Sequence, residues 1–152
     1  MKYKIIRVVA VIVMLNIVYV PFICNKFWSL KSEHSRSQAV YFFDTIESVR
    51  DGWSPDDVAP IHVMYYLGGL VCTLFIFISA LSKSTGACRF GSLIGIGLSL
   101  YLFYQVHSGT IIWYVHGNNA HLTYGYYISC VGFASMLTVS LVPQKETARA
   151  AQ

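Results

Sequence analysis

The sequence predicts an all-α membrane protein: a bundle of four transmembrane helices that forms a single membrane domain over residues 1–152. Of the 152 residues, 55% are hydrophobic and only 12% are charged, and the mean hydropathy is +0.53, which is too apolar for an ordinary soluble domain. Four apolar runs are each long enough to cross a bilayer, and in lipid only a helix satisfies its own backbone hydrogen bonds. The positions of Lys and Arg then orient these runs.

The first apolar run, residues 5–24, is expected to be a permanent helix and not a signal peptide. It is longer than a typical signal-peptide core, and no A-x-A-like cleavage site follows it. The other three predicted spans are residues 61–81, 90–106 and 122–142. They leave an external loop at 25–60, a cytoplasmic loop at 82–89, an external loop at 107–121 and a cytoplasmic tail at 143–152.

Basic residues separate clearly between the two sides of the predicted bundle. Lys2, Lys4, Arg7, Lys83, Arg89, Lys145 and Arg149 fall on one side, with Glu146 as the only acid. The other side holds four bases, which are mixed with the remaining six acids of the chain. Because Lys and Arg accumulate in cytoplasmic loops, we expect the N- and C-termini to be cytoplasmic, in a bacterial inner membrane or plasma membrane.

The first external loop carries a helical pattern of its own. Ala39, Phe42, Phe43, Ile46 and Val49 recur at helical spacing with charged residues between them, which predicts a short amphipathic helix. Two placements are open: flat on the membrane surface, or as a lid over the ends of the spans. The β-rich segment 110–115 in the second external loop is either a hairpin or a continuation of the third span.

Small residues predict where the helices touch. They let two backbones approach closely, within the molecule or across a homodimer, and they recur at four-residue spacing at Gly91, Gly95 and Ser99, at Gly68 and Cys72, and at Gly125 and Ser129. Asn16 and Gln105 are expected to form hydrogen bonds between helices. The four cysteines, Cys24, Cys72, Cys88 and Cys130, form no CxxC pair and are interpreted as small apolar residues of embedded helices.

Aromatic residues gather on the external side. All three tryptophans and most tyrosines fall there, whereas interfacial aromatic belts normally form at both membrane surfaces. A lipid headgroup or a membrane-protein partner on this side would account for the difference. The candidate partner-binding residues are Phe42, Phe43, Ile46, Trp53, Trp113 and Tyr114.

The five histidines also fall on the external side, as His34, His62, His107, His116 and His121. Hydrogen-bonded interfacial histidines, or a pH-sensitive outer surface, explain this placement without a cofactor, and none is predicted. The alternative is a haem or metal ion held by His62 and His107, because paired histidines on facing helices suit bis-imidazole ligation. Their spacing matches no dense metal motif.

The predicted plan is similar to that of claudin-type proteins and of small bacterial immunity proteins: four spans, cytoplasmic termini and a larger first external loop. The Trp and paired-Cys signature of the claudin first loop is absent between Asn25 and Pro60, so the similarity is one of plan and implies no membership.

The predicted spans lack the charged and catalytic residues that would indicate an ion pathway or an enzyme. No acid or base lies at the centre of a span, which removes the usual sign of an ion pathway, and no catalytic constellation is present, so we do not expect an enzyme. Basic residues beside spans are explained by topology, so no nucleic acid is expected. The leading hypothesis is a membrane interaction protein, as an accessory subunit, an immunity-like factor or a scaffold, whose partner is another membrane protein or a second copy. The alternatives are a haem- or metal-binding redox protein and a transporter of a small uncharged solute.

Overall fold

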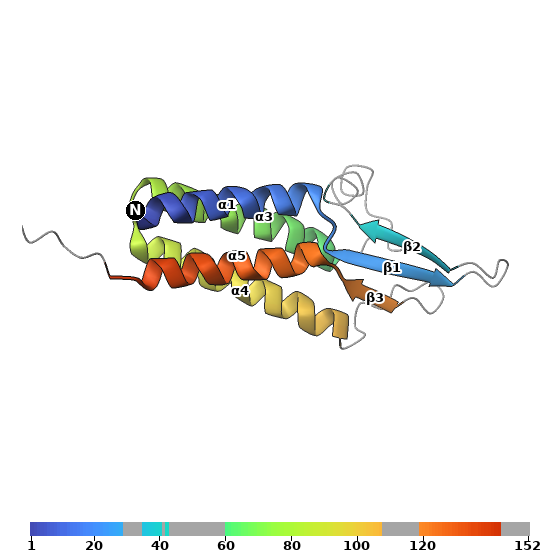
Figure 1. The fold of residues 1–152 in the computed structure, drawn as a ribbon. Coiled ribbons are helices and arrows are strands. Elements are labelled where there is room, and N and C mark those ends of the chain that lie inside the picture. Colours follow the sequence, from blue (N-terminus) through green and yellow to red (C-terminus); the bar gives the residue numbers. More distant parts are fainter. Residues whose placement is uncertain (29–34, 41, 43–59, 108–118, 144–152) are drawn as a thin grey trace, which may run out of the picture.

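The computed structural model describes residues 1–28, 35–40, 42, 60–107 and 119–143, which form four helices and three strands. The helices α1, α3, α4 and α5 run side by side as a bundle, and the strands form a small sheet at one end of it (Figure 1). Each helix is in contact with two neighbours, in the cyclic order α1, α3, α4, α5. A bundle of four helices is therefore present, as the sequence predicted.

Helix α1 spans Lys2–Tyr19 and ends earlier than the predicted span 5–24. Val20 has φ −115° and ψ 128°, an extended conformation. Pro21 explains this end, because a proline disfavours the helical conformation in the residue before it. The chain then enters strand β1, Ile23–Trp28, so Cys24 lies in a strand and not in the embedded helix to which it was assigned.

Helices α3, Pro60–Leu81, and α4, Thr85–His107, form an antiparallel hairpin with a very short turn. Lys83 adopts a φ of 55°, and the N–H of Ser84 donates to the carbonyl of Ser79 at 2.9 Å, which closes the end of α3. The predicted cytoplasmic loop 82–89 was too long. Helix α4 begins at Thr85, with the N–H of Cys88 already donating to the carbonyl of Ser84, because a charged residue such as Arg89 limits the apolar run but does not stop a helix.

A three-stranded antiparallel sheet, which the sequence did not predict, joins the two segments that follow α1 and α4. Strand β1 is central and pairs with β2, Ser35–Val40, and with β3, Asn119–Leu122. In the register, Lys26 lies opposite Ser37 on one side and Asn119 on the other. Ala39, the first residue of the predicted amphipathic helix, is in β2; Phe43, Ile46 and Val49 lie outside the described residues, as does the segment 110–115.

Helix α5 spans Tyr124–Leu141, close to the predicted span 122–142. Thr123 is its N-cap, and Val142, at its C-terminal end, has φ −60° and ψ 121°. Pro143 follows Val142 and explains this extended conformation, as Pro21 does for α1.

The bundle has two chemically different ends. At the basic end, Lys2 Nζ donates to the carbonyl of Val142 at 3.4 Å, and Arg89 donates to the carbonyl of Ser140 at 3.1 and 3.3 Å. The hydroxyls of Tyr3 and Thr85 lie 2.6 Å apart at the same end. The sheet lies at the opposite end of the bundle, which we call the sheet end (Figure 1).

Small residues lie at the contacts between helices. A Cβ added at Gly95 would lie 2.3 Å from the ring of Phe133, and one at Gly91 would lie 2.6 Å from Ile76. One at Gly68 would be 3.4 Å from Leu98, an ordinary contact. The helices around Gly91 and Gly95 therefore pack directly on each other, with neighbouring side chains resting on bare backbone.

The outside of the bundle carries many large apolar side chains. Large hydrophobic side chains are more than half exposed on every helix, including Ile12 on α1, Val71 on α3, Leu93 on α4 and Val131 on α5. Several buried side chains are polar, among them Asn16, Thr73, Ser92, Ser99 and Ser129. Among the described residues, α4 and α5 are long and apolar enough to cross a membrane.

Candidate functional site

The sheet is fixed to the bundle by a cluster of buried aromatic side chains. We call Phe22, Phe42, Tyr65, Tyr66 and Tyr126 the aromatic joint; each is at most 7% exposed. The ring of Phe22 stacks on Tyr66 at 4.9 Å between centroids and meets the edge of Tyr65 at 5.3 Å. Such pairs add about 0.5–1.5 kcal/mol beyond the burial of area.

Hydrogen bonds tie the same residues to three helices. The N–H of Phe22 donates to Tyr66 Oη at 2.9 Å, and Tyr126 Oη donates to the carbonyl of Ser99 at 2.9 Å. Ser99 Oγ donates to Gly95 at 2.9 Å and lies 3.1 Å from Tyr65 Oη. Since a serine hydroxyl has one proton, Tyr65 is the donor to Ser99.

Thr123, which follows β3, also attaches the sheet to the bundle. Its N–H donates to the carbonyl of Phe22 at 2.9 Å, and its hydroxyl donates to the carbonyl of Pro21. Gly125 lies beside this contact, and a Cβ there would be 2.6 Å from the Pro21 carbonyl oxygen. The segment that leads from α1 into β1 is thus bonded to the segment that leads from β3 into α5. These bonds fix the sheet to the ends of the two helices.

Asn16 forms a second polar contact just below the joint. Its Nδ2 donates to the carbonyl of Gly125 at 2.7 Å and to Ser129 Oγ at 2.8 Å, which joins α1 to α5 as expected for an interhelical hydrogen-bonding residue. Its Oδ1 is buried and accepts no hydrogen bond from the described residues. The side chain therefore stabilises one register of α1 against α5.

The predicted partner-binding residues are only partly described. Phe42 is buried, with its ring 6.3 Å from that of Tyr66, so its side chain belongs to the aromatic joint and is not exposed for a partner. Phe43, Ile46, Trp53, Trp113 and Tyr114 lie outside the described residues. Exposed aromatic residues among the described residues at this end lie on three helices: Tyr19 on α1, Tyr101, Phe103 and Tyr104 on α4, and Tyr124 and Tyr127 on α5.

The two candidate haem ligands lie at the same end of the α3–α4 hairpin. His62 is in the first turn of α3, and His107 is the last residue of α4. The His107 ring is exposed, stacks on Phe103 at 4.0 Å, and has Nδ1 3.1 Å from the Phe103 carbonyl. The described part of the chain contains no group of three or more His, Cys, Asp or Glu that could hold a metal ion.

The burial of three tyrosines was not predicted, because the sequence only placed most tyrosines on the external side. Tyr126 gives a usable signal: it precedes Ser129 by three residues and therefore shares a helix face with the small residues of α5. Tyr65 gives the same kind of signal, because it precedes Gly68 by three residues, whereas Tyr66 bears no such relation to Gly68 or Cys72. The burial of Tyr65 and Tyr66 depends on Phe22 and Ser99, which are distant in the sequence.

Comparisons with protein-family models, with curated proteins and with solved structures found no match for this chain.

Proposed function

We propose that this chain is a four-span membrane protein that acts by binding another membrane component through the sheet and the segments around it. The observation that carries the proposal is the combination of a sheet of mixed polar and apolar residues, fixed to the bundle by the aromatic joint, with a bundle that exposes large apolar side chains on all four helices. Such a surface is unusual for a soluble monomer and suits lipid. The partner then binds at the sheet end.

Charge distribution supports four spans. Asp, Glu, Lys and Arg are absent from residues 8–19, 60–81, 90–107 and 124–141, so each helix of the bundle has a continuous uncharged stretch. Helix α1 carries its three bases in its first turns, at the basic end, where Lys83 and Arg89 also lie. By the positive-inside rule this end is cytoplasmic, and the sheet is on the outer side.

The packed interior supports interaction over transport. Side chains from neighbouring helices rest on Gly91, Gly95 and Gly132, where an added Cβ would lie 2.2–2.6 Å from Ile76, Phe133 or Val13. Some buried polar groups are bonded across this interior, as Asn16 is to Ser129, whereas Thr73 and Ser92 donate to carbonyls of their own helices. A partner could be a different membrane protein, as for an accessory or immunity-like subunit, or a second copy of the chain.

Orientation is tested by labelling single cysteines. In a background in which Cys24, Cys72, Cys88 and Cys130 are replaced by alanine, Lys26→Cys and Lys83→Cys are treated in intact cells with a maleimide that does not cross membranes. We expect labelling at position 26 alone, and at position 83 only after permeabilisation. Labelling of both positions in intact cells would overturn the four-span arrangement.

Partner binding is tested by placing a photo-crosslinking amino acid at each position of β2 from Ser35 to Gln38 in native membranes. Neighbouring strand residues face opposite sides, so a partner should be captured at alternate positions, as one defined adduct or as a dimer of the chain. Leu93 and Val131, exposed on the apolar surface, are the controls and should capture lipid. Lipid adducts alone at all β2 positions would contradict the proposal.

A further inference from the structure

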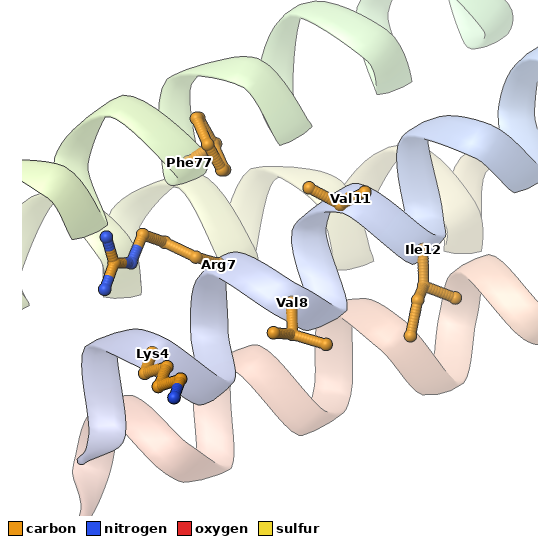
Figure 2. Close-up of a pocket in the computed structure, with 6 residues that line it drawn as sticks. All are labelled: Lys4, Arg7, Val8, Val11, Ile12 and Phe77. Atoms are coloured by element: carbon orange, nitrogen blue, oxygen red, sulfur yellow. The ribbon is translucent and has the colours of Figure 1, made fainter.

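A groove of about 460 Å³ runs along the seam between α1 and α3 near the basic end. Lys4, Arg7, Val8, Val11 and Ile12 of α1 line it, together with Phe77 of α3. Figure 2 shows the two basic residues at one end of the groove and Ile12 at the other, with Phe77 reaching from α3 towards α1.

The helical repeat arranges this lining along the axis of α1. Residues four apart lie on one face of a helix. Lys4, Val8 and Ile12 therefore form one row along α1, and Arg7 and Val11 form a second row beside it. From Lys4 to Ile12 the helix rises by about 12 Å. Each row therefore has a positive charge at the end of the bundle and aliphatic side chains towards its middle.

The two charges are available at the groove. The Arg7 side chain is held by a hydrogen bond from Nε to the carbonyl of Tyr3 at 3.3 Å, and its terminal nitrogens donate to no other described residue. Lys4 is exposed. All seven acids of the chain lie within residues 29–59 and 144–152, and Glu146 is the only one assigned to this end.

The apolar part of the groove is open to the surroundings. Val8 and Ile12 are each 53% exposed, and Val11 is 39% exposed. In a membrane this surface faces lipid chains. A ligand that fits the whole groove has an anionic group at one end and a hydrocarbon chain beyond it.

We infer that this groove binds an acidic phospholipid of the cytoplasmic leaflet, with the phosphate on Lys4 and Arg7 and an acyl chain against Val8, Ile12 and Phe77. Free phosphate would leave the apolar wall without a partner, and a zwitterionic lipid would gain less from two positive charges. The inference rests on the proposed membrane insertion, but it does not depend on the proposed partner.

The test compares binding of phosphatidylglycerol and phosphatidylcholine with identical acyl chains to the detergent-purified full chain, by native mass spectrometry. The expected result for the unmodified protein is a clear preference for phosphatidylglycerol. Each basic residue near a lipid surface is worth about a fivefold change in affinity, so Lys4→Gln/Arg7→Gln should reduce the preference by about 25-fold. Lys83→Gln, an exposed base at the same end but outside the groove, should leave the preference unchanged.

Two further measurements distinguish a phospholipid from the two other occupants considered for the groove, which are free phosphate and a helix of a partner protein. Val8→Phe narrows the groove without changing charge and should weaken binding of phosphatidylglycerol, whereas inorganic phosphate should not displace the lipid. Displacement by phosphate, or equal binding of both lipids to the unmodified protein, would overturn the lipid site. Co-purification of a protein that is lost in Val8→Phe would assign the groove to a partner helix instead. A chain that stays monomeric in buffer without detergent would overturn membrane insertion itself.

Discussion

The hydroxyl oxygen of Tyr66 accepts a hydrogen bond from the backbone N–H of Phe22 at 2.9 Å, and the two aromatic rings stack at 4.9 Å. Phe22 immediately precedes β1, whereas Tyr66 lies in the second turn of α3. One tyrosine therefore provides both a polar and an apolar contact where the chain turns from the bundle into the sheet. Because both residues are almost fully buried, neither contact can be replaced by water.

The replacement Tyr66→Phe tests this contact. It keeps the ring and removes the acceptor, so the Phe22 N–H is left buried without its partner, which should lower the free energy of unfolding by about 1–3 kcal/mol. Thermal unfolding of the detergent-purified protein measures the change, and hydrogen exchange should show faster opening of β1 than of α4. Tyr101→Phe, at an exposed position on α4, is the control and should change stability by less than about 0.5 kcal/mol. Equal effects of the two replacements would contradict the assigned role of Tyr66.

A pair of glycines on α4 tests the packing of the bundle. A Cβ at Gly95 would lie 2.3 Å from the Phe133 ring, whereas one at Gly97 meets nothing within 4 Å. We expect Gly95→Ala to destabilise the protein by about 1–3 kcal/mol through overpacking. Gly97→Ala should be neutral or stabilising by up to about 1 kcal/mol, because alanine favours a helix over glycine.

Unfolding of both variants in detergent with increasing sodium dodecyl sulfate measures this difference. The two residues share one helix, so differences in helix propensity cancel in the comparison. Equal stability of the two variants would show that α4 and α5 do not approach as closely as the structure has them.

The replacement Asn16→Asp tests the polar contact between α1 and α5. The carboxylate has the size of the amide but cannot donate to Gly125, whose carbonyl lies 2.7 Å from Asn16 Nδ2. A buried carboxylate without a countercharge should cost at least about 3 kcal/mol, even if the Ser129 hydroxyl donates to it. Ser129→Ala removes only one acceptor and should cost about 0.6 kcal/mol, the average for such bonds in membranes. Thermal unfolding compares the two, and a smaller loss for Asn16→Asp than for Ser129→Ala would contradict the orientation of the amide.

The sequence predicted the helices well because each one is encoded locally. The apolar stretches gave α3 and α5 to within a few residues, and the small residues at Gly91 and Gly95 lie where α4 meets its neighbours. The error at the end of α1 was avoidable, since Pro21 is a local signal that a helix should end before it. Treating the whole apolar run to Cys24 as one span gave hydropathy more weight than this signal.

The sheet and the aromatic joint depend on contacts that a single sequence does not contain. Strand β1 combines Cys24 with polar neighbours such as Asn25 and Lys26, and it pairs with β3, about 95 residues later, by the register of Lys26 with Asn119. No local period identifies such a pair. The burial of Tyr65 likewise depends on Ser99 and Phe22 meeting at one point, so both features required the three-dimensional structure.

The register of β1 against β2 is open to a direct test by disulfide formation. Cysteine pairs are placed at Asn25/Gln38 and at Lys26/Ser37, which lie opposite each other, in the background without native cysteines. Adjacent antiparallel pairs alternate between hydrogen-bonded and non-hydrogen-bonded types, so at least one of the two has suitable separation. The pair Asn25/Ser37 is offset by one residue, which places its side chains on opposite faces.

After mild oxidation, counting free thiols should show a disulfide in one or both opposed pairs and none in the offset pair. Oxidation of the offset pair alone would mean a slipped register, and no disulfide in any pair would remove the sheet on which the proposed binding surface is built.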